Sequence, residues 1–544
     1  MIITDILIKN AKEFPQDISL VEINPEVLEK REKEWKEFDL VETGNLTEHR
    51  REITWKEFND DANKFARMLM DQGIKKGDKV AILLMNCLEW LPIYFGILKT
   101  GALVVPMNFR YTSEEIKYCL NLAEADALVF GEEFTQRVEK IKDSTPKVKS
   151  LVFVGENCPN FSLCYDKMIV NYQGAEPEVE INPEDDGAIY FSSGTTGFPK
   201  GILHTHSSLL SACYTENNHH SQTKDDIFLC IPPLYHTGAK MHWFGSFLVG
   251  GKGILLKGVK PEWIIKTAAE EKASIVWLLV PWAQDILDEI DRKNIKIEDY
   301  DLSNWRLMHI GAQPVPPSLI SRWTKIFPGH QYDTNYGLSE SIGPGCVHLG
   351  VDNIHKVGAI GKAGYKWEVI ITDEKQIPVI QGDVGELMVK GPGVMKCYYN
   401  DPKATAEVLF GDWLLTGDMA RMDEDGFIHL VDRKKDVVIS GGENIYPVQI
   451  EDFLRKHDSI KDAAVIGLFD SRLGEIAAAV IEIKDDVKIT KEEIMLFCED
   501  LPRYKRPKKI FFDKIPRNPT GKIEKLKIRE KYCADNLVDI QNKI

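Results

Sequence analysis

The residues between Tyr190 and Gly201 are the ones best suited to hold phosphate. Their order is Tyr-Phe-Ser-Ser-Gly-Thr-Thr-Gly-Phe-Pro-Lys-Gly, so hydroxyl side chains alternate with glycines. Glycines let backbone N–H groups turn toward an anion, and Lys200 adds a positive charge. The strict nucleotide P-loop is absent, because Pro199 stands where its second glycine would be. The segment therefore predicts a different kind of phosphate-binding loop.

Four other segments place charged side chains at turns. They are Tyr-Gly-Leu-Ser-Glu at 336–340, Trp-Leu-Leu-Thr-Gly-Asp at 413–418, Asp-Arg-Lys-Lys-Asp at 432–436, and Pro-Arg-Asn-Pro-Thr-Gly-Lys at 516–522. In the last of these, Lys522 follows a turn, so its backbone is held rigidly. Taken singly, each segment is also compatible with an ordinary surface turn or a run of solvated charge.

The chain around these segments predicts alternating helices and strands. Thr54 and Glu57 form a capping-box pattern that opens an amphipathic helix ending at Gly73. Apolar runs then predict strands over 79–84, 102–106, 127–130, 228–231 and 274–280, and helices over 90–98 and 261–271, with a second capping box at Thr112 and Glu115. This alternation predicts an α/β fold with doubly wound parallel sheets covered by helices.

The pattern changes in the second half of the chain. Beyond about residue 365, short alternating strands at 367–372 and 385–390 predict a small β unit. After Asp432 an α+β segment follows, with strands over 462–467 and 477–483 and a helix capped by Thr490 and Glu493. We therefore predict an N-terminal domain over residues 1–432 and a C-terminal domain over 433–544. The charged residues 25–37 predict a solvated helix at the start of the fold.

Composition narrows the classes of partner. A chain of 544 residues is too long to fold around one hydrophobic core, so several structural units are expected. The net charge of −16 argues against nucleic acid as a partner. The ten cysteines include no CxxC pair, so the sequence predicts neither a disulfide framework nor a zinc knuckle. Reduced cysteines are typical of cytoplasmic proteins, and we therefore expect the protein to be cytoplasmic. The first fifteen residues are too charged for a secretory signal. The apolar run at 90–105 contains Lys99 and is too short to span a bilayer, so we expect no integral membrane segment.

Taken together, the motifs resemble those of the adenylate-forming (AMP-binding) superfamily, and within it the acyl-CoA synthetases or acid–CoA ligases. The match runs from about residue 50 to 530 with the motifs in family order, and Ser339 replaces the commoner threonine of the Tyr-Gly-x-Thr-Glu motif. The resemblance implies a large N-terminal domain and a mobile C-terminal lid that rotates between two reaction steps.

The resemblance also implies roles for particular residues. Those implied to bind ATP are Ser192, Ser193, Gly194, Thr195, Thr196, Gly197, Lys200, Asn335, Tyr336, Gly337, Ser339, Asp418 and Arg433. Asn335 corresponds to the residue that reads the adenine amino group, Tyr336 to the one that stacks on the base, and Asp418 to the one that holds the ribose. Lys522, His236 and Glu340 are implied to be catalytic, with Glu340 and Thr196 holding magnesium (Mg2+).

The resemblance also implies residues for the second reaction step and for binding of the acid substrate. Asp432 and Lys435 are implied to form the hinge of the lid, and Ser440, Gly441 and Gly442 to bind coenzyme A. The residues expected to line the acyl pocket are His236, Thr237, Trp243, Trp282, Gly311 and Ala312. If the two tryptophans point inward, they shorten or flatten the pocket, which favours medium-chain, cyclic or aromatic acids.

The expected reaction has two steps. A small-molecule carboxylic acid and ATP give acyl-AMP and pyrophosphate, and coenzyme A then gives acyl-CoA and AMP. Two alternatives use the same first step: loading of an acyl group onto a carrier protein, and a luciferase-like oxygenase. An amino-acid substrate is disfavoured because Thr237 stands where amino-acid-specific relatives carry aspartate. A homodimer is one assembly that the sequence leaves open.

Histidine pairs invite a metal interpretation at two places. His204 and His206 are separated by one residue, and His219 and His220 are adjacent. No carboxylate or cysteine follows either pair at a useful spacing, so we predict no metal there.

Overall fold

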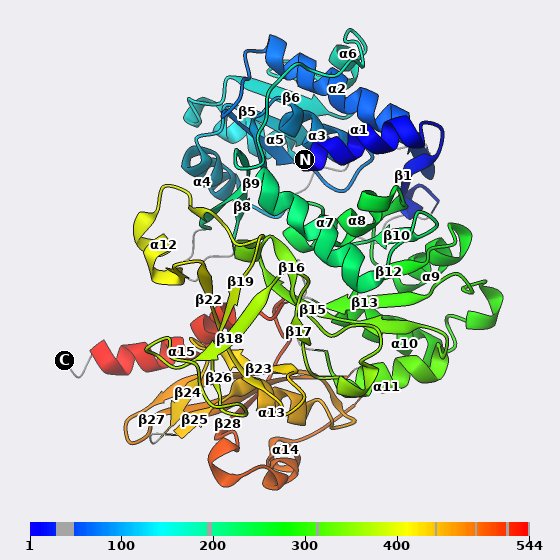
Figure 1. Ribbon diagram of the computed structural model, residues 1–544. Helices are drawn as coiled ribbons and strands as arrows, with labels where there is room; N and C mark the ends of the chain where they lie inside the picture. Colours follow the sequence, from blue (N-terminus) through cyan, green and yellow to red (C-terminus); the bar gives the residue numbers. More distant parts are fainter. Residues whose placement is uncertain are drawn as a thin grey trace.

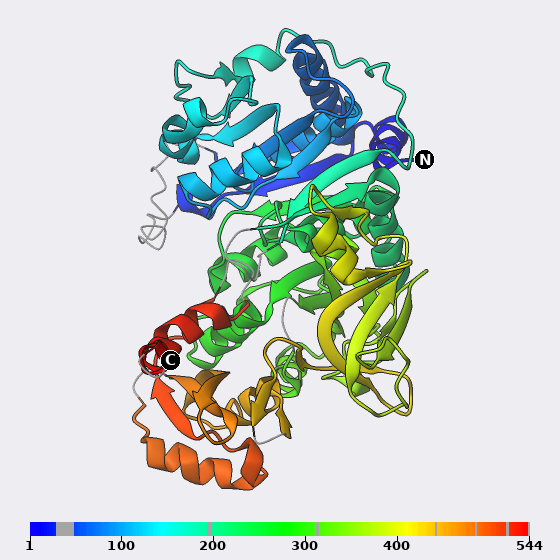
Figure 2. The ribbon, with the colours of Figure 1, turned by 90° about the vertical axis from the view of Figure 1, so that its left-hand side faces the viewer.

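The computed structural model describes residues 1–28, 48–192, 199–311, 315–440, 443–484, 487–517 and 522–541. Its N-terminal part stacks two large sheets and their helices, a β unit lies beside the second sheet, and a small α+β unit forms the opposite end of the molecule (Figures 1 and 2). This arrangement confirms the predicted α/β class with a separate C-terminal α+β unit.

The first sheet contains eight strands in the order β20-β9-β8-β4-β3-β5-β6-β7. In that order they span Cys397–Tyr398, Gly201–Thr205, Asp186–Phe191, Leu103–Pro106, Lys79–Leu83, Ala127–Gly131, Ser150–Val154 and Leu163–Cys164. Strands β8, β4, β3, β5, β6 and β7 pair in parallel, whereas β8, β9 and β20 pair antiparallel. The predicted phosphate loop therefore connects the two arms of the β8–β9 hairpin.

The second sheet contains seven strands in the order β14-β13-β12-β10-β11-β1-β2. In that order they span Gln331–Asp333, Leu307–Gly311, Ile275–Leu279, Ile227–Cys230, Lys252–Leu256, Ile18–Ile23 and Arg50–Thr54. All neighbouring pairs are parallel except β1 with β2. Successive side chains of a strand point to opposite faces of its sheet. In β12, Trp277 faces the core shared with the first sheet, whereas Val276 and Leu278 face the other side.

Helices cover both sheets, and the predicted capping boxes are present. Thr54 caps α2 (Trp55–Asp71) and Thr112 caps α4 (Ser113–Ala123), each with the predicted glutamate bonding back to the cap. The other helices of this part are α1 (Ile3–Glu13), α3 (Trp90–Lys99), α5 (Thr135–Ile141), α6 (Tyr165–Ile169), α7 (His206–His220), α8 (Thr237–Val249), α9 (Pro261–Glu270), α10 (Val280–Asp291) and α11 (Pro317–Ile326). Of the predicted helix at 25–37, Pro25–Val27 form a 3-10 turn and residues 29–47 lie outside the described chain.

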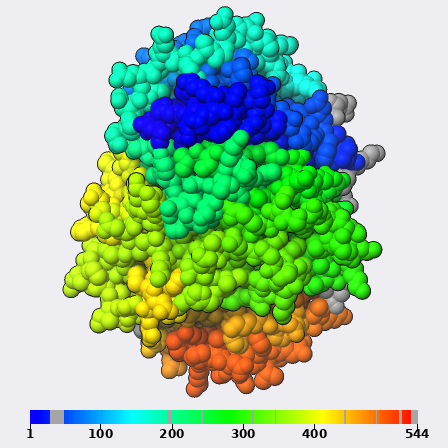
Figure 3. Space-filling view, turned by 45° about the vertical axis from the view of Figure 1, so that its right-hand side comes forward, coloured from blue at the N-terminus to red at the C-terminus, as the bar shows by residue number. Residues whose placement is uncertain are grey.

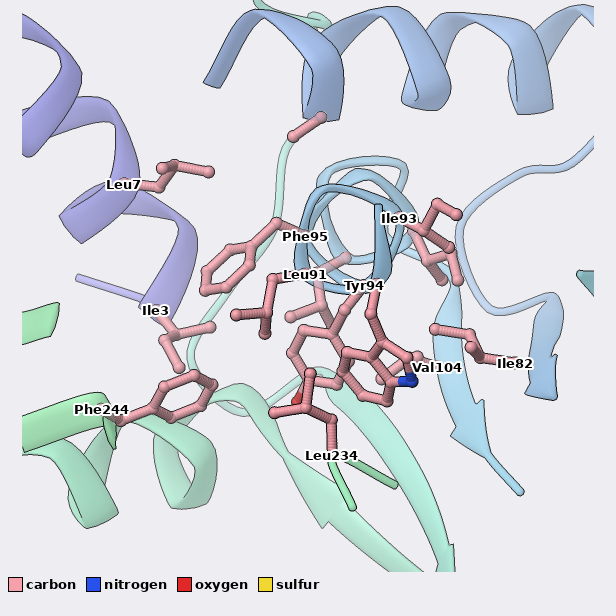
Figure 4. Packing of buried hydrophobic residues seen from close by; sticks show 14 of the residues in the cluster. Ile3, Leu7, Ile82, Leu91, Ile93, Tyr94, Phe95, Val104, Leu234 and Phe244 are labelled. Carbon is pink, nitrogen blue, oxygen red and sulfur yellow. The ribbon is translucent and has the colours of Figure 1, made fainter. Parts of the chain in front are cut away.

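The core between the two sheets is centred on α3. Phe95 and Tyr94 of this helix lie among Ile3 of α1, Val104 of β4 and Phe244 of α8 (Figure 4). Every residue of α3 is buried, which explains why its apolar residues continue around the whole helix. No helix among the described residues is both long and apolar enough to cross a membrane.

The β unit and the C-terminal unit complete the chain. The β unit contains β15 (Asn335–Leu338), β16 (Gly343–His348) and β17 (Lys362–Ala363), together with β18 (Glu368–Thr372), β19 (Gly385–Lys390), α12 (Pro402–Val408), β21 (Leu409–Phe410), β22 (Trp413–Met422) and β23 (Ile428–Arg433). The C-terminal unit contains β24 (Val438–Ser440), β25 (Glu443–Ile445), α13 (Pro447–Leu454), β26 (Ile460–Asp470), β27 (Gly474–Ile483), α14 (Lys491–Phe497), β28 (Lys509–Phe512) and α15 (Lys525–Gln541). In the space-filling view this unit packs directly against the rest of the molecule (Figure 3).

Candidate active site

The β8–β9 hairpin holds the base of the predicted phosphate loop. The Ser192 N–H donates to the Lys200 carbonyl at 3.1 Å, which closes the loop where the two strands meet. The ammonium of Lys200 lies 4.8 Å from the centre of the Tyr398 ring. Residues 193–198, which include the predicted Ser193, Gly194, Thr195, Thr196 and Gly197, lie outside the described chain.

Glu340 follows β15 at a short turn and lies beside this hairpin. Its Oε1 accepts a hydrogen bond of 2.8 Å from the Tyr398 hydroxyl. The carbonyl of Ser339 lies 2.8 Å from His204 Nε2, a side chain of β9. Tyr398 itself reaches the site because β20 pairs with β9, placing it opposite Ile202. The carboxylate predicted to hold magnesium is therefore anchored to the hairpin that carries the phosphate loop.

Asp418 is the buried carboxylate of the site, with 5% of its surface exposed. Tyr336 donates its hydroxyl hydrogen bond to Oδ2, and Arg433 Nε lies 2.6 Å from Oδ1. The register of β22 and β23 places Asp418 directly opposite Arg433. Burial, reinforced by the charge of Asp418, raises the pKa of Tyr336 well above its usual value, so Tyr336 remains a donor.

Lys522 comes to this group of residues from the C-terminal unit. Burial is the main cause that lowers the pKa of Lys522, and the nearby charge of Arg433 lowers it further. Asp418 and Glu340 act in the opposite direction, because their negative charges favour the ammonium form. The structure thus brings Lys522 within electrostatic reach of both predicted nucleotide-site carboxylates.

The segment between the β unit and the C-terminal unit is anchored by Asp432. Its Oδ2 accepts from the Val448 N–H at 3.0 Å, and its Oδ1 accepts from the Arg433 N–H at 2.7 Å. Burial raises the pKa of Asp432 to about 6. Lys435 is exposed and Ser440 is half-buried at the end of β24, whereas Gly441 and Gly442 lie outside the described chain.

His236 stands at the N-terminus of α8. Its Nδ1 accepts from the Gly238 N–H at 3.2 Å, which assigns the ring proton of a neutral imidazole to Nε2. Thr237 is buried beside it. A Cβ atom at Gly238 would lie 3.3 Å from the Trp277 ring, and one at Gly311 would lie 4.0 Å from Trp277 Nε1. Trp277 therefore lies between Gly238 and the predicted pocket position Gly311.

The two tryptophans predicted for the acyl pocket have different surroundings. Trp243 is 2% exposed and packs in the core against Phe247 and the backbone of Gly253. It is not brought together with His236, since its helix turns the indole toward β11. Trp282 is half-buried at the start of α10, where it packs against both core clusters of the second sheet. Ala312 lies outside the described chain.

Sequence reasoning missed three residues that the structure adds to the site. Tyr398 bonds to Glu340, Trp277 lies beside Gly238, and Glu216 accepts a hydrogen bond of 3.1 Å from Asn335 Nδ2. Trp277 carried a local signal, because its strand was predicted and period two assigns it a face. Tyr398 and Glu216 carried none, since each reaches the site by a contact with a distant part of the chain.

Comparisons with known proteins agree with this arrangement. The family model for AMP-binding enzymes matches residues 29–399, and the model for the AMP-binding enzyme C-terminal domain matches residues 449–522. The anthranilate CoA ligase AuaEII, solved in complex with anthranoyl-AMP, has the same fold, with a TM-score of 0.87 over 99% of this chain and 98% of that one at 23% identity.

Curated relatives extend over most of the chain. A long-chain fatty acid–CoA ligase of Mycobacterium tuberculosis (strain ATCC 25618 / H37Rv) is 32% identical over 87% of this chain and 92% of its own length. A 2-succinylbenzoate–CoA ligase of Bacillus cereus is 30% identical over 84% of this chain and 89% of its own length. With both family models matched in order, the chain belongs to the AMP-binding enzymes of the adenylate-forming superfamily, in the acyl-CoA synthetase family.

Proposed function

We propose that this protein is an ATP-dependent acid–CoA ligase that works in two steps. A carboxylate oxygen attacks the α-phosphorus of ATP, giving acyl-AMP and pyrophosphate. The thiol of coenzyme A then attacks the acyl carbon, giving acyl-CoA and AMP. The observation that carries the proposal is the approach of Lys522, from the C-terminal unit, to Asp418 and Glu340 of the N-terminal part.

Lys522 is the residue assigned to the first step. Two anions must come together for this reaction, and an ammonium between them lowers the cost of their approach. Burial disfavours the charged form of Lys522 in the free protein, whereas two bound anions favour it. Its loss is therefore expected to slow adenylation far more than thioester formation.

Asp418 and Arg433 are assigned to the ribose. A carboxylate can accept hydrogen bonds from both ribose hydroxyls, and the 2.6 Å contact with Arg433 Nε holds this carboxylate in place. Tyr336, whose hydroxyl bonds to the same carboxylate, is assigned to stack on the base, with Asn335 reading the adenine amino group. Ser192, Gly337 and Ser339 are assigned to the phosphates with Lys200.

The magnesium ion is assigned to Glu340 and Thr196. Glu340 fits this role because Mg2+ prefers oxygen ligands, and the Tyr398 hydroxyl at 2.8 Å fixes the orientation of its carboxylate. When bound, the ion neutralises phosphate charge. Tyr398 and Lys200 position the site for it, with the Lys200 ammonium 4.8 Å from the Tyr398 ring.

The second step is assigned to the lid. We place the domain boundary at residues 432 and 433, because β23 ends the β unit there and β24 belongs to the sheet of the C-terminal unit. Rotation about Asp432 and Lys435 would replace Lys522 by the segment Ser440, Gly441 and Gly442, which we assign to coenzyme A. His236, at the start of α8, borders the acid in both steps.

The acid is proposed to be medium-chain, cyclic or aromatic. Trp277 is 4% exposed and lies between Gly238 and Gly311, so a flat, short cavity is favoured over a long tunnel. Equal turnover of palmitate and benzoate-type acids would contradict this proposal. Substituting Trp277→Ala is expected to shift the preference toward longer acids.

The cell compartment and the assembly remain proposals as well. All ten cysteines are free thiols, which suits a reducing cytoplasm. Light scattering on the purified protein distinguishes a monomer from the homodimer that the sequence leaves open.

A pyrophosphate-release assay tests the proposed function. Purified protein is given ATP, magnesium and a panel of acids, with and without coenzyme A, beside the Lys522→Ala variant. Lys514→Ala is the matched control, because Lys514 is an exposed lysine of the same unit. We expect acid-dependent release that coenzyme A accelerates, that Lys522→Ala reduces by at least about 100-fold (about 2.7 kcal/mol), and that Lys514→Ala leaves intact.

Other outcomes would identify a different function. Pyrophosphate release that depends on an acid but does not change when coenzyme A is added would favour the carrier-protein or oxygenase alternative. Equal activity of the Lys522→Ala and Lys514→Ala variants would refute the assigned role of Lys522.

A further inference from the structure

A buried group of histidines and carboxylates lies beside the nucleotide site and has no assigned part in the reaction. Its members are Glu216 and His220 of α7, His309 of β13, Asp333 of β14 and His348 of β16. None of these residues is more than 2% exposed. We call them the His/Asp cluster.

Three members of the His/Asp cluster offer ligand atoms around one point. One nitrogen each of His220 and His309 and one oxygen of Asp333 all lie within 4.8 Å of one another. His220 Nε2 and Asp333 Oδ2 are already 2.9 Å apart. Ligands about 2.1 Å from one tetrahedral ion lie about 3.4 Å apart, so small side-chain rotations bring all three into range.

The topology explains why these three meet. Strands β13 and β14 are parallel neighbours, and their register places His309 directly beside Asp333. The last turn of α7 then brings His220 against both. The ligands are far apart along the chain, which is why local spacing around His219 and His220 predicted no metal.

The surroundings of the three residues resemble the outer shell of a metal site. Ligating histidines usually direct the second ring nitrogen at a carboxylate or carbonyl. His220 Nδ1 lies 3.5 Å from Glu216 Oε2, and Asp333 Oδ1 accepts from the Gly350 N–H at 2.8 Å. His348 lies next to these three residues, with its Nδ1 3.2 Å from Asp333 Oδ2. From this position it can act as a fourth ligand or as a hydrogen-bond donor to Asp333.

The charges and the donor atoms favour one class of ion. Among the described residues, ion pairs join the buried carboxylates of Glu216 and Asp333 to the imidazoles of His220 and His348. A divalent cation would balance both negative charges. Two imidazoles and a carboxylate suit zinc and its neighbours, whereas magnesium and calcium prefer oxygen.

We propose that His220, His309 and Asp333 bind one divalent transition-metal ion of the zinc type. The site is buried, so the ion would be structural: it would fasten α7 to β13 and β14 beneath the nucleotide site. It is separate from the magnesium ion that accompanies ATP, which needs oxygen ligands and is assigned to Glu340. The proposal does not depend on the identity of the acid or on the ligase reaction.

Metal content and metal binding test this proposal directly. The full-length protein is stripped with a chelator, titrated with Zn2+ or Co2+ alone, and passed through a desalting column before elemental analysis. We expect about one equivalent of Zn2+ per chain to remain, and the Co2+ form to show the visible absorption of a tetrahedral or five-coordinate ion. Retention of less than a tenth of an equivalent, or a Co2+ spectrum equal to that of the free ion, would overturn the proposal.

Substitutions assign the metal to these residues. His309→Ala is expected to lose the bound metal, and Glu216→Gln to weaken binding by about 10-fold to 100-fold, as is usual for outer-shell partners. His330→Gln is the matched control, because His330 stacks on Trp305 and Phe327 and is not among the three proposed ligands.

If His309→Ala fails to fold, Asp333→Asn and His220→Gln replace it as ligand variants, because both approximately keep the side-chain volume. Metal retained by all three ligand variants at the level of the His330→Gln control would place the ion elsewhere and overturn the assignment. The thermal midpoint of the stripped wild type should rise on adding Zn2+, and an unchanged midpoint at saturating Zn2+ would also contradict a structural ion.

Discussion

Tyr398 shows how one hydroxyl can orient a carboxylate, here that of Glu340, which we propose to bind magnesium. It is nearly buried, its ring lies beneath the Lys200 ammonium, and its hydroxyl donates to Glu340 Oε1 at 2.8 Å. A hydrogen bond to a charged group is commonly worth about 1.5–3 kcal/mol. We therefore expect Tyr398 to be a positioning residue, which acts through Glu340 in the proposed function.

Removing this hydroxyl should weaken the use of ATP. For Tyr398→Phe we expect the KM for ATP, measured at saturating magnesium and acid, to rise about tenfold, which corresponds to about 1.4 kcal/mol. Tyr399→Phe is the control, because the hydroxyl of Tyr399 donates at 2.8 Å to Glu124, a residue with no assigned part in the site. Equal KM values for the two variants would show that the bond to Glu340 does not position it.

His206 links protonation to stability. Burial lowers the pKa of His206 from its usual 6.5 to about 4. The unfolded chain then binds more protons than the native protein between these pH values, so the free energy of unfolding rises with pH across this window. His206 therefore contributes at most about 3 kcal/mol to the change in the free energy of unfolding with pH. This stability is present in full above pH 6.5 and is lost progressively as the pH falls toward 4.

The His206→Phe variant should therefore flatten this part of the pH profile. Thermal midpoints are measured between pH 4.5 and 7 for the wild type, His206→Phe, and His355→Phe as an exposed control. We expect a smaller loss of midpoint on acidification in His206→Phe alone. A slope identical to that of the wild type would mean that other groups govern the acid response.

At the scale of elements, α8 and β11 meet through a glycine. A Cβ atom at Gly253 would lie 2.4 Å from Trp243 Nε1. The indole can pack directly against the strand because that position has no side chain, and it is also in contact with Phe247 at a ring separation of 5.2 Å. This close approach turns Trp243 into the core and away from His236.

Gly253→Ala should destabilise the protein by about 1–3 kcal/mol, because the added methyl overpacks the contact. Trp243→Phe removes the atoms that clash, so the double variant should be more stable than the sum of the two single effects predicts. Gly329→Ala is the control, because a Cβ atom there meets no atom of the described residues within 4 Å. Strict additivity in denaturant unfolding would refute the packing explanation.

At the scale of the whole molecule, contacts of Lys434 join the proposed hinge segment to the β unit. Lys434 Nζ lies 3.0 Å from Glu386 Oε2, and the Lys434 N–H donates to the Gly417 carbonyl at 2.9 Å. Glu386 Oε1 accepts from the Gly417 N–H at 3.1 Å. These bonds hold the segment after β23 against the β unit in the arrangement that brings Lys522 within electrostatic reach of Asp418 and Glu340.

Weakening them should favour other lid positions. For Lys434→Met we expect pyrophosphate release without coenzyme A to fall about twofold, since a half-exposed ion pair is worth about 0.5 kcal/mol. Thioester formation from preformed acyl-AMP should not slow. The exposed Lys375→Met is the control, and the difference should shrink at high salt. A decrease in both steps would indicate general damage rather than a shifted lid.

The sequence by itself determined the local structure and the family. Capping boxes at Thr54 and Thr112, buried strand runs, and the order of five motifs depend on neighbours in the chain, so they could be predicted without coordinates. The class of fold and the ligase family followed from them.

The tertiary structure decided which side chains share a space. Sheet pairing brought Tyr398 to Glu340, strand register placed His309 beside Asp333, and the absence of a side chain at Gly253 turned Trp243 into the core. Periodicity shows which face of an element is buried but not which partner buries it. Contacts between distant segments depend on how whole sheets and helices pack, and no local pattern in the chain encodes that.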